Sequence, residues 1–248
     1  MKNRIVRQGL RFLEKGGERL LVVAFCGNNR PPEFVEFQQK VFAHFNIPIN
    51  HLFADFPNCS HGEGIDRFVA TINDGCDYLL LFDTDALPLR RDFIDIAYDK
   101  IRDKRTVFGV AQQSNHIAVN GTVNHVYAGP CAFAISRKMY IGLGRPTFAE
   151  TPRSDCAEEI TWRAEELGYT ICLMFPSHVH EKRWRLGNGH QFGIGTTYGD
   201  CVFHAFAQAE EESKQLFLQK CEEILNRSAS RNGKNLAHRC AETSILKP

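Results

Sequence analysis

The feature that most constrains the fold of this chain is an alternation of short apolar segments with amphipathic segments between residues 19 and 113. The apolar segments begin near residues 19, 49, 78 and 106 and are hydrophobic almost throughout, as in YLLLFD. The segments between them carry apolar residues at helical spacing. Short strands that are apolar on both faces and alternate with helices are typical of a mostly parallel central sheet flanked by helices. The sequence therefore predicts an α/β fold.

The chain is expected to form a single domain over residues 19–207, followed by a tail. The domain divides by its pattern into halves at 19–113 and 114–207. A stretch rich in Gly, His and Arg at 178–200 predicts a lid loop, because long loops inside compact domains are usually functional. Residues 208–248 are expected to form a C-terminal helix and a mobile end.

Composition limits which partners the protein is expected to bind and in which cellular compartment it is expected to lie. The net charge of +1 supplies no broad basic field, so nucleic acid is not expected as a partner. Nine cysteines without a Cys-x-x-Cys pair indicate mostly buried, reduced thiols in a cytoplasmic protein. No apolar run approaches the ~20 residues that a membrane span needs. The basic segment 1–18 is expected to be a helix or arm that either packs on the domain or makes weak peripheral contact with a membrane.

Two aspartates, Asp83 and Asp85, directly follow the apolar segment YLLLF. Residues i and i+2 of a strand point to the same side, so both carboxylates can face one ligand. Ligands of such sheets bind beyond the carboxyl ends of the strands. Carboxylates favour Mg²⁺ or Mn²⁺, which in turn bind phosphate oxygens. The pair therefore predicts a metal and phosphate site at this strand end.

Two stretches carry a resemblance to a known family, namely GEGIDRFVATINDGCDYLLLFDTD and AEEITWRAEELGYTI. In this order they resemble the GT-A glycosyltransferases, especially the family 2-like members, in which a DxD motif ends an apolar strand and an acidic pair opens a later helix. The resemblance covers roughly residues 19–206. It implies a GT-A fold with a nucleotide-binding half at 19–113 and an acceptor half at 114–207.

The resemblance also implies a reaction. Enzymes of this kind move a sugar, with inversion, from a nucleotide-diphosphate sugar to a hydroxyl group of a glycan, a lipid or another acceptor. A UDP- or GDP-sugar is the expected donor, and Mn²⁺ or Mg²⁺ is the expected cofactor on its diphosphate. A carboxylate takes the proton of the acceptor hydroxyl as it attacks.

Site residues are carried over from the matching motifs. Asp85 corresponds to the direct metal ligand, and Asp83 to a residue that contacts the metal, its water or the ribose. The remaining metal ligand is left open between His180 and His204. Besides Asp83, the residues expected to bind the donor are Ala24, Phe25, Cys26, Asn28, Arg30, Asp55, Gly64, Arg67, Thr84 and Gly129.

The catalytic base is expected among Glu158, Glu159 and Asp155, with Glu158 first. A carboxylate near a helix N-terminus stays ionised, which suits a base. The same residues also allow a structural role, because Asp155 and Glu158 have capping-box spacing and Glu159 lies four residues before Arg163. Polar residues past a strand end either bind sugar hydroxyls or fill a loop, namely Gln112, Gln113, Asn115 and His116.

Three other classes share part of this pattern. A haloacid-dehalogenase-type phosphatase also ends an apolar strand with DxD, but normally on its first strand. A non-catalytic nucleotide-sugar binding protein would keep the binding residues without the base. A nucleotidyltransferase would need a basic, glycine-rich loop after the first strand, where FCGNNRPPEF has one glycine and one arginine.

Overall fold

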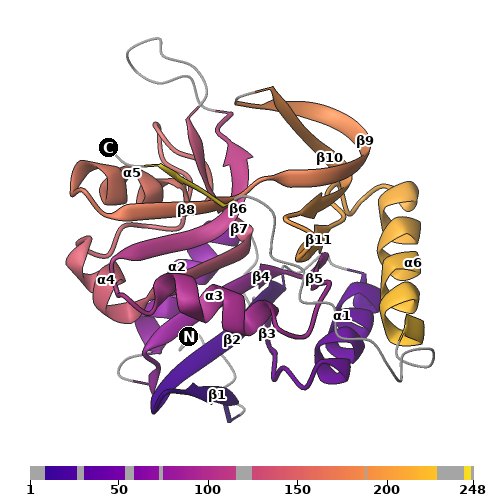
Figure 1. Ribbon diagram of the computed structural model, residues 1–248, viewed down its shortest axis with the longest axis horizontal. Helices are drawn as coiled ribbons and strands as arrows, with labels where there is room; N and C mark the ends of the chain where they lie inside the picture. Colours follow the sequence, from indigo (N-terminus) through magenta and orange to yellow (C-terminus); the bar gives the residue numbers. More distant parts are fainter. Residues whose placement is uncertain are drawn as a thin grey trace.

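A computed structural model describes residues 9–26, 31–53, 59–72, 75–115, 125–187 and 189–227, and the backbone of a strand at 243–246. Within these residues the chain forms a mixed α/β fold with two β-sheets and six helices (Figure 1). The strands are β1 (Phe12–Lys15), β2 (Glu18–Cys26), β3 (Asn50–Phe53), β4 (Tyr78–Asp83), β5 (Ala86–Pro88), β6 (Thr106–Gln113), β7 (Val126–Ser136), β8 (Thr170–Met174), β9 (Pro176–Leu186), β10 (His190–Tyr198), β11 (Val202–His204) and β12 (Thr243–Leu246). The helices are α1 (Pro32–His44), α2 (His61–Thr71), α3 (Phe93–Ile101), α4 (Arg137–Gly142), α5 (Glu158–Glu166) and α6 (Glu211–Arg227).

The larger sheet has eight strands in the order β1-β2-β4-β7-β6-β8-β12, with β3 also paired to β2. β2, β3, β4, β6 and β8 run in one direction, and β1, β7 and β12 run in the other. The strands that alternate with helices are thus parallel, as expected, but the sheet as a whole is mixed. The parallel strands bring their carboxyl ends to one edge, which is where ligands of such sheets bind.

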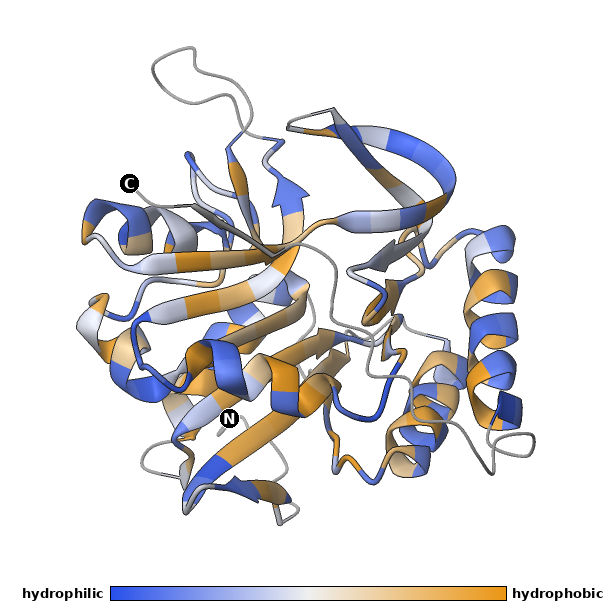
Figure 2. Cartoon of the chain, viewed as in Figure 1, coloured by the Kyte–Doolittle hydropathy of each residue, from blue (hydrophilic) through white to orange (hydrophobic). Residues whose placement is uncertain are grey.

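Alternation along the strands builds a core on each face of this sheet. In β2, Leu21 and Val23 join the apolar cluster that α2, α4 and α5 cover, whereas Leu20 and Val22 join the cluster that α3 covers. Burial of each such side chain contributes about 1.5–3 kcal/mol. Figure 2 shows the hydrophobic residues concentrated in these strands. The near-continuous apolar runs of the sequence are therefore explained by burial on both faces.

The smaller sheet has the order β5-β11-β10-β9. It is connected directly to the larger sheet, because β5 follows β4 in the chain. A third apolar cluster fills the space between this sheet, α1 and α6. Within it the rings of Phe34 and Phe217 lie 4.6 Å apart. This packing fixes where the chain goes immediately after the DxD motif.

The helix predicted for the segment 1–18 is wrong for its described part. Phe12–Lys15 form β1, which pairs with β2 in an antiparallel hairpin. Gly16 and Gly17 connect the two strands with φ values of 59° and 81°. Two glycines at positive φ give the tight turn whose twist matches a hairpin, so they end any helical path at this point.

The loop predicted at 178–200 is also wrong, because β9 and β10 occupy most of it as an antiparallel hairpin. The role of this segment as a lid stays a prediction. Most residues of β9 are exposed or half-buried. β9 is hydrophilic along most of its length, as Figure 2 shows. A strand that buries little has no apolar run to mark it. Its charged residues, together with the glycines of the turn and of β10, are typical of a loop.

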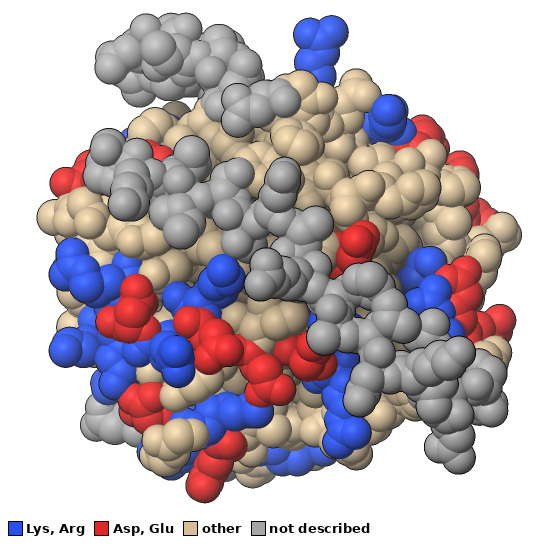
Figure 3. Space-filling model, viewed as in Figure 1, with Lys and Arg blue, Asp and Glu red and all other residues tan. Residues whose placement is uncertain are grey.

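Charges of both signs are mixed on the surface near α3 and β1 (Figure 3). Lys15 pairs with Asp95 there, and Arg90 pairs with Asp92. Exposed pairs of this kind contribute about 0–1 kcal/mol each. In the described part of the chain, none of the helices combines the length and the apolar character that crossing a membrane would require.

The cysteines of the described ranges are mostly free thiols, as expected. Seven are free, and five of these are buried. Burial raises the pKa of Cys131, so its thiol stays neutral. Cys201 differs from the prediction, because it is disulfide-bonded.

Candidate functional site

Strand β4 ends at the candidate site because its sequence turns polar at Asp83. The five residues before it are buried between β2 and β7. Thr84 and Asp85 then turn the chain into β5, and Asp85 is only 2% exposed. β5 pairs with β11 in a register that sets Ala86 opposite His204. The junction of the two sheets thus brings His204 to the motif.

Asp83, Asp85 and His204, here called the Asp–Asp–His group, have the chemistry of a metal site. His204 Nε2 lies 3.2 Å from Asp85 Oδ1 and 3.7 Å from Asp83 Oδ2. One ligand atom from each residue lies within 4.8 Å of the other two. The carboxylates suit Mg²⁺ or Mn²⁺, and the imidazole nitrogen favours the transition metal of the two. The residues present therefore fit a divalent cation.

His204 has a perturbed pKa in this surrounding. Burial lowers the pKa of its imidazole, whereas the charge of the Asp85 carboxylate and the hydrogen bond with it raise this pKa, and the net shift is upward. A protonated ring offsets part of the buried carboxylate charge. A cation needs the neutral ring as its ligand, so a proton and a cation compete for this nitrogen.

His61, which the sequence analysis missed, also reaches the motif. It is the first residue of α2, and its Nε2 lies 3.1 Å from Asp83 Oδ1. Its ring packs edge-on against Phe25 at 5.3 Å. One turn further along, Gly64 has no room for a side chain, because a Cβ there would lie 1.8 Å from Phe25 Cζ. The predicted residues Phe25 and Gly64 thus meet beside the group.

A buried amide holds the DxD turn in place. Gln38 of α1 is fully buried, and its Nε2 donates to the carbonyls of Asp83 at 2.7 Å and Ala86 at 2.8 Å. Its Oε1 lies 2.9 Å from His51 Nε2 on β3. One side chain therefore connects a helix, a neighbouring strand and the turn that carries the carboxylates. In the sequence, Gln38 is marked only by its position on the buried face of α1, where an apolar residue is expected.

A pocket of about 270 Å³ adjoins the Asp–Asp–His group. The contact runs through Phe206, which lines the pocket and packs against His204 with ring centroids 3.7 Å apart and ring planes tilted by 42°. Among the base candidates, Asp155 lines it, whereas Glu158 and Glu159 do not. We call it the aromatic pocket; its lining residues are Gln112, Gln113, Asn115, Tyr127, Pro130, Glu150, Asp155, Cys156, Trp184, Phe192 and Phe206.

Glu158 is a buried structural carboxylate. It is 0% exposed and accepts hydrogen bonds at 2.7 Å from the Ser114 hydroxyl and the Asp155 N–H. Its Oε1 lies 2.7 Å from His125 Nδ1. Burial raises the pKa of Glu158, but the hydrogen bonds lower it by more than burial raises it, so the net shift is downward. Glu158 stays ionised, yet it has no surface from which to meet an acceptor.

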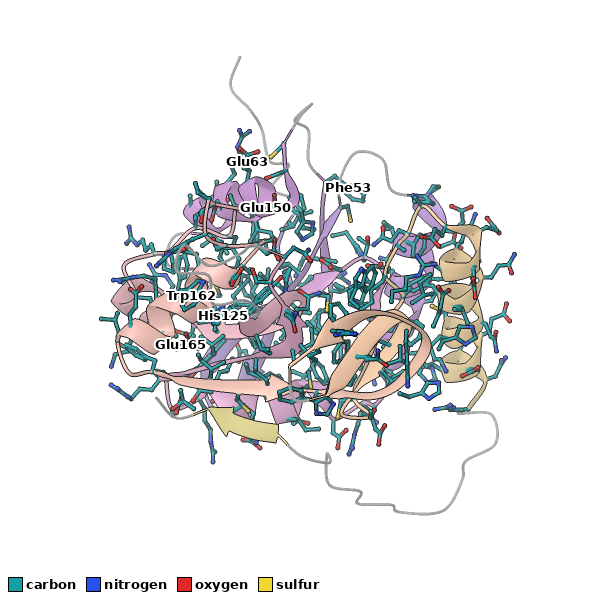
Figure 4. All side chains as sticks on the ribbon, turned by 90° about the horizontal axis from the view of Figure 1, so that it is seen from above. Phe53, Glu63, His125, Glu150, Trp162 and Glu165 are labelled. Atoms are coloured by element: carbon teal, nitrogen blue, oxygen red, sulfur yellow. The ribbon has the colours of Figure 1, made fainter. Side chains whose placement is uncertain are left out.

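His125 completes this buried pair. Its ring stacks on Trp162 at 3.7 Å, and its Nε2 lies 3.3 Å from Glu165 (Figure 4). Burial lowers the pKa of His125, but its hydrogen bond with Glu158 and the nearby Glu165 carboxylate raise it, and the net shift is upward. The pair therefore ties the start of β7 to α5.

Two further candidates lie away from the Asp–Asp–His group. Glu159 pairs with Arg153 rather than with Arg163. His180 is half exposed on β9 and lies 3.5 Å from Glu212 of α6. The structure therefore brings together Asp83, Asp85 and His204 but not His180.

The remaining donor-site candidates occupy varied positions. Ala24 and Cys26 are buried in β2, and Arg67 is exposed on α2. Thr84 is 1% exposed, and its hydroxyl has no hydrogen-bond partner among the described residues. At Gly129 a Cβ would lie 2.2 Å from Gln112 Oε1, so the glycine makes room for a residue of the aromatic pocket. Candidates outside the described residues are Asn28, Arg30, Asp55 and His116.

No protein-family model and no curated protein matches this chain. A solved structure of A197 from STIV is 13% identical with a TM-score of 0.33, over 47% of this chain and 65% of that chain. The inositol-1-phosphate CTP transferase from T. maritima is 12% identical with a TM-score of 0.36, over 84% of this chain and 78% of that chain. Likenesses of this size do not establish a shared activity.

We expect Gln38→Met to lower the free energy of unfolding by about 1–3 kcal/mol, because it removes the donor from two carbonyls at the DxD turn. Gln39→Met, on the exposed side of the same helix, is the matched control and should change stability by less than about 0.5 kcal/mol. Urea unfolding followed by circular dichroism measures both. Equal stability of the two variants would show that Gln38 does not hold the turn.

The His125–Glu158 pair predicts a pH dependence of stability. The pKa of His125 is raised, so its stabilising effect is complete below the ordinary value of 6.5 and is lost as the pH rises through the folded-state value. We expect wild type to exceed His125→Gln in unfolding free energy by more at about pH 6 than at about pH 9. His178→Gln, on exposed β9, is the control and should show no such change. A pH-independent difference for His125→Gln would refute the charged pair.

Proposed function

We propose that this protein is a metal-dependent glycosyltransferase with a GT-A fold, which moves a sugar from a nucleotide-diphosphate sugar to an acceptor hydroxyl. The observation that carries the proposal is the Asp–Asp–His group. Asp85 and His204 are 119 residues apart in sequence and meet at the carboxyl end of a parallel strand. Burying two carboxylates and an imidazole costs free energy, so packing alone does not explain why they are gathered at this junction, where ligands of such sheets bind.

In this proposal Asp83, Asp85 and His204 would hold the cation through their carboxylates and imidazole. When bound, the divalent cation neutralises charge on the departing nucleotide diphosphate. Phe25 and His61 pack against each other beside the Asp–Asp–His group, on the side of Asp83. His61 holds the Asp83 carboxylate in orientation through their contact at 3.1 Å.

Asp155 is the base that the geometry supports best. It lines the aromatic pocket next to the Asp–Asp–His group, and the Asn115 N–H donates to its Oδ2 at 2.7 Å. The carboxylate takes the proton of an acceptor hydroxyl in the pocket, while the hydroxyl oxygen attacks the anomeric carbon and the nucleotide diphosphate leaves. Glu158 supports this arrangement by accepting the Asp155 N–H, which fixes the backbone at the base.

Nucleotide release from UDP- and GDP-sugars with Mn²⁺, Mg²⁺ or EDTA tests the function. We expect metal-dependent release from one donor, and a loss of about 100-fold or more in Asp85→Asn and His204→Ala. His180→Ala is the matched control and should keep the wild-type rate, because His180 lies on β9 beside Glu212. Binding of the nucleotide with Mn²⁺ but no release from any donor would instead indicate a non-catalytic nucleotide-sugar binding protein.

Substitution of the base should separate catalysis from binding. We expect Asp155→Asn to lower kcat of transfer by about 10²–10⁴-fold with little change in the affinity for the donor. Glu159→Gln removes a carboxylate outside the aromatic pocket and should leave kcat nearly unchanged. Steady-state transfer rates with the donor identified above measure both. A larger loss of kcat in Glu159→Gln than in Asp155→Asn would indicate that Glu159, and not Asp155, is the base.

A further inference from the structure

The wall of the aromatic pocket is built from three side chains of the second sheet and the segment after it. The ring centroids of Trp184, Phe192 and Phe206 are 5.3–5.6 Å apart. Trp184 faces Phe192 across the β9–β10 hairpin, in register. Phe206 continues the row of rings to His204 at 3.7 Å. An aromatic surface therefore leads from the Asp–Asp–His group outward to Trp184.

Trp184 stands out because its ring remains accessible. It is 39% exposed, whereas Phe192 is 7% exposed. The chain has two tryptophans, and the other, Trp162, stacks on His125. A tryptophan that lines a pocket and still exposes 39% of its surface offers an apolar platform to a ligand.

The backbone at Phe206 is held in an uncommon conformation that keeps this row of rings together. Its φ is +59°, in the left-handed region that large side chains avoid. The Ser213 hydroxyl of α6 donates to its carbonyl, which supports the conformation. Strain of this kind persists only where the surrounding structure over-determines it, and it is concentrated at functional sites.

Five of the eight other lining residues carry an amide or a carboxylate, and these groups narrow the class of ligand. Gln112, Gln113 and Asn115 supply amide groups, and Glu150 and Asp155 supply carboxylates. None of the described residues that line the pocket is Lys or Arg. Two carboxylates repel a phosphorylated or acidic ligand. The amides can donate hydrogen bonds to hydroxyls and accept them, and the carboxylates can accept them.

Resting on the proposed function, we propose that the acceptor is a neutral saccharide whose ring stacks on Trp184 in the aromatic pocket. A sugar ring presents C–H groups on its faces and hydroxyls around its edge. The C–H groups match the indole ring of Trp184, and the hydroxyls match the amides and carboxylates of the pocket. A lipid alcohol would leave those polar groups unpaired, which costs affinity. The volume of about 270 Å³ suits one terminal ring, with the rest of the saccharide outside.

Saccharide binding can be read from Trp184 itself. In Trp162→Phe, Trp184 is the single tryptophan, so its emission reports the pocket. The probes are methyl glycosides of glucose, galactose, mannose and N-acetylglucosamine, with glycerol as the control. We expect a saturable change in emission with at least one glycoside and none with glycerol. A lack of saturation with all four glycosides overturns the inference, whether or not the protein turns over a donor.

Transfer assays place the saccharide in the reaction. We expect Trp184→Ala to raise KM for the glycoside by about tenfold or more and Trp184→Phe by less, while UDP or GDP with Mn²⁺ still raises the melting temperature. Ile141→Ala is the control, because Ile141 is 40% exposed on α4 and lies outside the pocket. Transfer to farnesol or to a serine peptide but to no glycoside overturns the inference and leaves the glycosyltransferase standing. No metal-dependent release from any donor overturns the proposed function instead.

Discussion

The structure of the site depends on burying the Asp85 carboxylate at the junction of two sheets. An isolated buried charge costs several kcal/mol, so such a group is kept only with partners. His204 supplies the charged partner, and the Ala205 N–H fixes the backbone by donating to the Asp85 carbonyl at 3.0 Å. Gln38 holds the turn from the other side. Packing of α1 and α6, pairing of β5 with β11 and placement of the carboxylates are thus consequences of one arrangement.

The start of the acidic helix carries one carboxylate that is buried and, three residues earlier, one that lines the aromatic pocket. Both carboxylate oxygens of Glu158 are engaged in hydrogen bonds, with Ser114, His125 and the Asp155 N–H. A carboxylate so committed is a poor base, because taking a proton would break the pair that keeps it buried. Asp155, three residues earlier, lines the aromatic pocket instead. In our proposal the buried Glu158 orients the base without replacing it.

Much of the first half of the fold could be predicted from its sequence. β2, β4 and β6 are buried on both faces, so their apolar runs identify them without knowledge of their neighbours. The hairpin of β9 and β10 could not be recognised in this way, since β9 buries little and is held by pairing with β10. Gln38 and His61 were missed because a buried amide and a helix-start histidine look like ordinary surface residues until their partners are known.

By itself the sequence determined that an apolar strand ends in Asp83 and Asp85 and that this end belongs to an α/β sheet, because local periodicity encodes both. It could not choose between His180 and His204, which are equal as imidazoles. Only the tertiary structure decided, by pairing β11 with β5 so that His204 lies over the motif while His180 turns toward α6. The register between strands far apart in the chain is a property of packing, and no local pattern records it.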